Sequence, residues 1–352
     1  MDRGFMAAVA AAAAPRSQQY QAQEGQSQRG AAQFIPRSLV HMEKICAEYE
    51  KAMLATAENV GKAEVRARLY DGIWYPVHHF KALKRHGLDE RISLLARQRA
   101  FLDGRVALGV FERCPSKLGP LSFRLVEGFT PSEGLNALDG GLSILDCGTV
   151  CVLADFRALQ DVLGTEKFNR LFSKKLLFDL NSLMELRKRK EIKDESELQE
   201  GDSCYFQSIK TSTDASGKEI PGYVDTHPFD HGRGWNVICR GGNEKEKTYL
   251  GFGLPASKPV KGKDIEDALF DAYLEEPFLA EEAIPPAVLQ QTPRKKPVQI
   301  TREQFDAAPP LEEQIHPKSR LHPVVIQYDL EKIQQLIDAD IEEVEAVFAR
   351  FK

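Results

Sequence analysis

Residues 145–156 read LDCGTVCVLADF, and in this stretch the chain changes from an extended pattern to a helical one. The residues just before Cys147, GLSILD (141–146), form a short apolar run. From there on, apolar residues recur at helical spacing, which predicts a helix over 148–163 that ends at Gly164. Cys147 is therefore expected at the point where an extended segment passes into a helix.

A cysteine at the start of a helix has surroundings that favour a nucleophile. The N–H groups of the first turn have no partner in the helix and the helix dipole adds partial positive charge, so a thiolate is stabilised there. Gly148 leaves room beside the sulfur for a substrate carboxamide, and the same N–H groups can hold an oxyanion. Asp146 opposes thiolate formation unless it points away. Spacing alone favours the simpler interpretation that Cys147 is a small buried residue.

Further motifs follow one another in a defined order along the chain. They are CP (114–115), GPLSFRLVEG (119–128), DCGT (146–149), KFN (167–169), LFS (171–173) and GDSCYF (201–206). Their order and spacing resemble those of the spore-coat type of bacterial protein-glutamine gamma-glutamyltransferases, and the chain is identified as a divergent member of that family. In this resemblance Cys147 matches the family's nucleophile.

The resemblance implies a fold, a reaction and a class of partner. The fold is an α+β, papain-like or NlpC-like cysteine acyltransferase core with extra helices at both ends. The Cys147 thiolate attacks a glutamine carboxamide, and the thioester passes to a lysine amine to give an isopeptide cross-link, or to water to give deamidation. The partner is a protein substrate with exposed Gln and Lys. The alternatives are a catalytically inactive transglutaminase-like binding module and a papain-like thiol protease or amidase.

Two assisting positions depart from the family pattern. Where the family has its catalytic glutamate and histidine, this chain has Trp235 in GWNV and Phe252 in GFG. Three explanations stay open. A base was relocated to the preceding loop HPFDHGRG (227–234), the chain is a pseudoenzyme, or the pairing of positions is shifted and the base lies elsewhere, for example at Glu219.

The relocated base has named candidates. His231 is the first choice and His227 the second, with Asp230 to orient the imidazole, because a neutral histidine can accept a thiol proton near pH 7. The simpler alternative is a solvated polar loop.

Composition limits the other classes of function. The net charge is only −5, so no global field predicts nucleic-acid binding. The basic run RKRKEIK (187–193) sits among acidic residues and is expected to form a solvated helix end. No apolar run is long enough to predict a membrane span. Six scattered cysteines without a CxxC pair predict neither disulfides nor a zinc site, and a cytoplasmic location is expected, with non-classical secretion left open. No cofactor and no metal is expected.

The chain divides into four segments by pattern. Residues 1–35 are rich in Ala, Gln and Ser and are expected to be a disordered tail. Residues 36–283 are expected to be the catalytic domain, helical over 36–104 and with its core over 105–283. A proline-rich linker (284–298) and a C-terminal helical segment (299–352) complete the chain.

Overall fold

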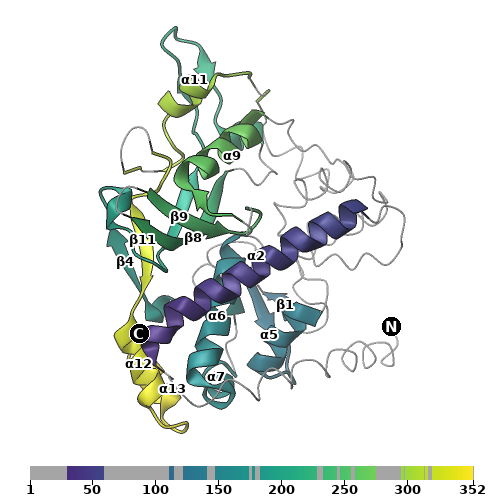
Figure 1. The fold of residues 1–352 in the computed structure, drawn as a ribbon, viewed down its shortest axis with the longest axis vertical. Coiled ribbons are helices and arrows are strands. Elements are labelled where there is room, and N and C mark those ends of the chain that lie inside the picture. Colours follow the sequence, from purple (N-terminus) through teal and green to yellow (C-terminus); the bar gives the residue numbers. More distant parts are fainter. Residues whose placement is uncertain are drawn as a thin grey trace.

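The protein is seen in a computed structural model. It describes residues 30–58, 111–114, 122–140, 147–173, 177–178, 183–227, 233–243, 246–254, 258–274, 295–296, 298–312, 314–315 and 319–351. Helices and antiparallel sheets combine in one molecule (Figure 1), which confirms the α+β prediction.

The largest sheet has six strands, and each described pairing in it is antiparallel. Its order is β10 (Val260–Lys261), β9 (Glu246–Gly251), β8 (Gly234–Asn243), β5 (Ser203–Gln207), β11 (Val324–Tyr328) and β4 (Arg187–Glu191). Strands β8 and β9 form a hairpin in which Gly241 and Gly242 pair with Thr248 and Lys247, with a register shift between Cys239 and Gly241. Both faces of this sheet carry helices, so its central strands are largely buried.

Smaller elements complete the described residues. A second sheet contains β1 (Phe111–Cys114), β2 (Ser122–Leu125) and β3 (Leu177–Phe178), and a short hairpin contains β6 (Ser212–Thr213) and β7 (Glu219–Ile220). Short helices that precede β8 are η1 (Ala31–Gln33), α5 (Pro131–Gly140), α7 (Thr165–Phe172), η2 (Met184–Leu186), η3 (Glu195–Glu197) and α8 (Tyr223–Thr226).

The central helix is α6 (Cys147–Leu163), which agrees with the predicted helix to within one residue. It ends at Gly164, whose positive φ of 79° reverses the chain into α7. Most of α6 is buried, because the long helix α2 (Phe34–Glu58) crosses it on one side and β8 contacts it on another. Figure 1 shows α2 running diagonally over α6. At the far end, Phe156 packs edge-to-face on Phe172 at 5.2 Å.

A buried charge network joins this helix to the sheet. Asp155, two turns after Cys147, accepts hydrogen bonds from Ser38 of α2 at 2.6 Å and from the Arg187 guanidinium of β4 at 3.1 Å. It also accepts from the hydroxyl of Tyr328 of β11. Arg187 in turn donates to the Tyr328 hydroxyl at 2.6 and 2.9 Å. Burial raises the pKa of Asp155, while Arg187 opposes that shift.

The basic run at 187–193 is a correction to the sequence analysis. It forms the edge strand β4 and not a helix end. Pairing with β11 along five residues outweighs local helix propensity there. Arg187 turns inward to the network, whereas Lys188 and Arg189 are exposed.

The C-terminal residues also differ from the expected helical segment. They contain α11 (Arg302–Ala307), then β11, and then α12 (Leu330–Asp338) and α13 (Val344–Ala349). The sequence did not predict β11, which lies between β5 and β4 inside the large sheet. The predicted domain boundaries stay a prediction, but residues after 298 supply a strand of this sheet.

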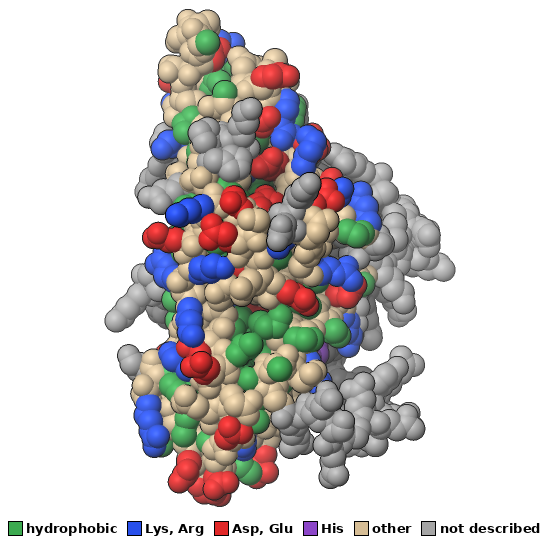
Figure 2. All heavy atoms as spheres, turned by 60° about the vertical axis from the view of Figure 1, so that its left-hand side comes forward, with side chains coloured by type: hydrophobic (Ala, Val, Ile, Leu, Met, Phe, Trp, Pro, Cys, Tyr) green, Lys and Arg blue, Asp and Glu red, His purple; other side chains and the backbone are tan. Residues whose placement is uncertain are grey.

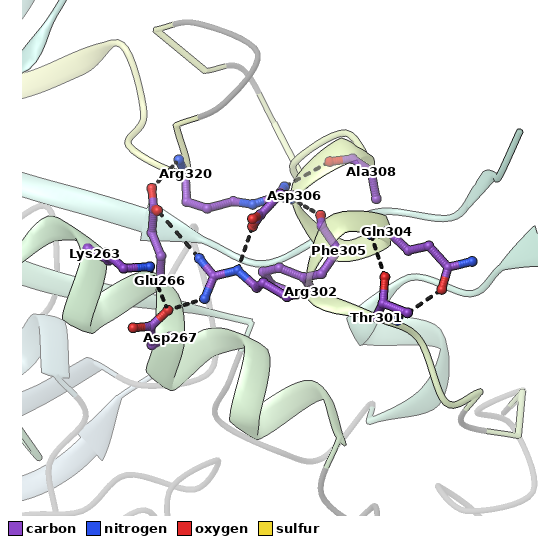
Figure 3. A network of polar contacts seen from close by, with 10 residues as sticks. All are labelled: Lys263, Glu266, Asp267, Thr301, Arg302, Gln304, Phe305, Asp306, Ala308 and Arg320. Carbon is purple, nitrogen blue, oxygen red and sulfur yellow. Dashed lines mark hydrogen bonds and ion pairs between the residues drawn. The ribbon is translucent and has the colours of Figure 1, made fainter.

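A second polar network fastens α11 to α9 (Gly262–Leu274), as Figure 3 shows. Arg302 of α11 pairs with Asp306 at 2.7 Å, with Glu266 at 3.7 Å and also with Asp267, both of the latter from α9. Arg320 donates from its backbone N–H to Glu266 at 3.0 Å and from its guanidinium to carbonyls at the end of α11. Burial lowers the pKa of Arg320 to about 10.

The surface carries both signs of charge. In Figure 2, basic and acidic side chains are interspersed over the visible face, hydrophobic side chains gather near its middle, and acidic ones gather at the lower end. No single-sign field covers this face, in agreement with the small net charge. Within the described residues, no helix is both long and apolar enough to cross a membrane.

The Asp155 network gives a stability prediction. Asp155→Ala is expected to lower the free energy of unfolding by about 3–5 kcal/mol, because it leaves the buried Arg187 charge without its carboxylate. Urea unfolding followed by circular dichroism measures the loss.

The matched control is Asp161→Ala on the same helix. Asp161 pairs with Arg37 at 3.3 Å and with His41 at 2.7 Å, but its side chain is 34% exposed. Its loss is expected to stay within about 1 kcal/mol. Equal small losses for both variants would contradict the importance given to the network.

Candidate active site

Cys147 is the first residue of α6, and its side chain is 4% exposed. Its sulfur accepts two hydrogen bonds from Asn236 of β8. The backbone N–H donates at 3.4 Å and the side-chain Nδ2 at 3.3 Å. The expectation that Cys147 lies where a helix begins is met, and its sulfur contacts the strand that carries Trp235.

The strand register explains why Asn236 meets the sulfur and Trp235 does not. Successive side chains of a strand point to opposite faces, so Trp235 and Asn236 point apart. Trp235 lies opposite Phe206 of β5, and the Phe206 ring lies under Gly262 at the start of α9. An apolar residue at 235 therefore removes no polar group from the side of the strand on which Cys147 lies.

The two departures from the family pattern contact each other. The indole Nε1 of Trp235 donates to the carbonyl oxygen of Phe252 at 2.8 Å, and both side chains are buried. If Gly253 were replaced by another residue, the new Cβ atom would lie 3.5 Å from the Trp235 ring. The two residues that the sequence analysis matched to the family's base and histidine are thus joined by this hydrogen bond.

Other thiols near the site lack the same surroundings. Cys151, one turn along α6, donates weakly to the Asn236 carbonyl oxygen at 3.9 Å. Burial raises the pKa of Cys151 well above its usual value, and the neighbouring Cys147 adds to this. Burial likewise raises the pKa of Cys204, and that of Cys239 to about 11. These thiols are protonated core residues at neutral pH.

Tyr205 of β5 is the cross-strand partner of Asn236 and therefore shares its face. Its hydroxyl donates to the Arg233 carbonyl at 3.5 Å. Burial raises the pKa of Tyr205, and the charge of Cys147 contributes to the increase. Gly234 allows this arrangement, since a Cβ there would lie 2.1 Å from the Tyr205 oxygen.

The histidines and acids predicted to assist are placed as follows. His227 is 2% exposed, stacks on Tyr223 with ring centroids 4.6 Å apart and interacts through Nδ1 with Thr226 Oγ1 at 2.6 Å. Asp230 and His231 lie outside the described residues. Glu219 lies in the hairpin β6–β7, where it pairs with Lys295 at 2.9 Å.

The sequence analysis did not single out Asn236, whose N–H groups contact the sulfur, although it stands in the quoted GWNV stretch. The signal that could have found it is the two-residue period of the strand, combined with the position of Cys147. In the part of the chain that the structure describes, no cluster of His, Cys, Asp and Glu has the form of a metal site.

A cysteine that opens a helix packed on an antiparallel sheet is the arrangement that the sequence analysis expected. Residues 117–219, which include Cys147, match the family described as protein-glutamine gamma-glutamyltransferase. The resemblance recognised from the ordered motifs is thereby confirmed over this segment of the chain.

One solved structure and the curated proteins complete the comparison. The transglutaminase from Geobacillus stearothermophilus, without its C-terminal extension, aligns over 86% of this chain and 99% of its own, with 15% identity and a TM-score of 0.42. No curated protein is a significant match to this sequence.

The site predicts a difference in reactivity between two cysteines of one helix. Cys147 and Cys151 are each 4% exposed, so exposure alone predicts equal alkylation. Because Cys147 accepts two N–H groups, whereas burial raises the pKa of Cys151, iodoacetamide is expected to modify Cys147 at least about tenfold faster. Peptide mass spectrometry of the native chain at pH 7.5 measures both rates. Equal rates would show that the N–H groups do not activate Cys147.

Proposed function

We propose that this chain transfers the acyl group of a protein glutamine through Cys147. The observation that carries the proposal is the Cys147 sulfur at the start of α6, held by two N–H donors of Asn236, within the segment that matches the family. Helix-terminal N–H groups and the dipole of α6 favour a thiolate at that position.

The reaction has two steps. The Cys147 thiolate attacks the γ-carbonyl carbon of a glutamine, the C–N bond breaks, and the leaving nitrogen takes a proton to depart as ammonia. The thioester is then attacked by a lysine amine, which loses a proton and forms an isopeptide bond while the thiolate is regenerated. Water in place of the amine yields glutamate, and exclusion of water from the site favours transfer.

The proton carrier of this proposal is a histidine of the loop before β8. His231 remains the first choice, with Asp230 to orient it and His227 as the second choice. The packing of His227 supports this order, because its ring is stacked on Tyr223 and tilted against Tyr273 at 6.1 Å. An imidazole used in that packing is less available to move a proton at the sulfur.

The proposed partner is a protein that exposes both a glutamine and a lysine, since members of the family act on protein substrates. The proposed location is the cytoplasm, where a reactive thiol stays reduced. The rival proposal of an inactive binding module is favoured by the aromatic pair Trp235 and Phe252 at the family's assisting positions.

Amine incorporation tests the reaction. Wild-type chain is incubated with a glutamine-bearing protein and a labelled primary amine, and both incorporation and ammonia release are followed. Cys147→Ala and His231→Ala are each expected to reduce both signals by at least about a hundredfold, because nucleophile and base act in the same step.

Cys151→Ala is the matched control, since it changes the same residue type one turn away on α6 and is expected to keep most of the activity. Full activity in His231→Ala would show that His231 is not the base, and His227 or an acid would then be the candidate. A wild type that releases no ammonia, incorporates no amine and cleaves no peptide would favour the binding module.

A further inference from the structure

Asn236 donates to one atom from both its backbone nitrogen and its side-chain amide nitrogen. The backbone N–H and the side-chain Nδ2 lie 3.4 and 3.3 Å from the Cys147 sulfur. A sulfur that has lost its proton is an acceptor only, and it accepts such bonds more strongly than a thiol does. Two N–H donors from one residue therefore stabilise the thiolate of Cys147 more than its neutral thiol.

The backbone N–H of Asn236 can reach the sulfur because β9 ends before it would pair with Asn236. The last β8–β9 pair is Val237 with Gly251, so Asn236 lies one residue beyond the ladder. Its carbonyl oxygen accepts from Cys151 while its N–H donates to Cys147, so both backbone groups of Asn236 are directed at α6. The first turn of α6 occupies the edge of β8 that β9 leaves unpaired.

The chemistry of the amide limits what it can do. A carboxamide has no proton to lose or gain near neutral pH, so Asn236 is no base. We propose that Asn236 stabilises the thiolate of Cys147 through its two N–H donors and holds the sulfur in position for attack. This deepens the proposed function and rests on it for its catalytic meaning.

Two titratable groups interact electrostatically with Cys147, namely Cys151 of α6 and Tyr205 of β5. Around Cys151 lie Cys46 of α2, Asp155 of α6 and Arg187 of β4, and around Tyr205 lie Arg233 and Glu312. Each variant below leaves all of these side chains in place, so a difference between variants reports the loss of the Asn236 amide.

The test is the pH dependence of Cys147 alkylation by iodoacetamide in the full chain. Asn236→Ala removes the side-chain donor, and the midpoint of the rate profile is expected to rise by about one to two pH units. Asn236→Asp keeps the size and adds a negative charge, so its midpoint is expected to rise further. Asn243→Ala, at the exposed end of the same strand, is expected to leave the midpoint unchanged.

The outcomes separate this inference from the proposed function. Unchanged midpoints in both Asn236 variants would overturn the role of Asn236, whatever the transfer assay shows. A raised midpoint in the variants of a chain that shows no transfer would support the role of Asn236 and reject the acyltransferase. If Asn236→Ala fails to fold by circular dichroism, the isosteric Asn236→Asp decides, and a midpoint at or below that of wild type in that variant overturns the inference.

Discussion

The buried carboxylate of Asp155 is the interaction on which the rest of the structure depends. It joins the N-terminal helix through Ser38, the edge strand through Arg187 and the C-terminal strand through Tyr328. A buried ion pair adds little net stability over an apolar replacement, but it penalises every arrangement that leaves one partner alone. The network therefore selects which elements meet, and by holding α6 against the sheet it also sets where Cys147 lies.

The contact between Cys147 and Asn236 depends on where strand β9 ends beside β8. Because β9 stops at Gly251, the start of α6 reaches the free edge of β8 and Cys147 meets Asn236. The Trp235 side chain points to the other side of the strand from Asn236, and its indole donates to the Phe252 carbonyl oxygen. A change from polar to apolar residues at those positions thus leaves the immediate surroundings of the sulfur polar.

The C-terminal part of the chain is as much a part of this framework as the cysteine helix. Strand β11 supplies Tyr328 to the buried network and lies between β5 and β4. Helix α11 is fixed to α9 through Arg302 and Arg320, whose charges are balanced by Glu266, Asp267 and Asp306. The surroundings of Cys147 therefore depend on residues more than 150 positions further along the chain.

The sequence by itself determined the local elements and the helix position of the candidate nucleophile. The 3.6-residue period after Cys147 and the glycine at 164 are short-range signals, and they became the expected helix and its expected end. The ordered motifs sufficed to recognise the family. The tertiary structure decided what depends on contacts between distant residues. It made the run at 187–191 a strand, because β11 pairs with it, and it brought Asn236 to the sulfur, because register and strand end fix which side chain faces α6. Local propensity carries no information about either pairing, since both partners lie many residues away.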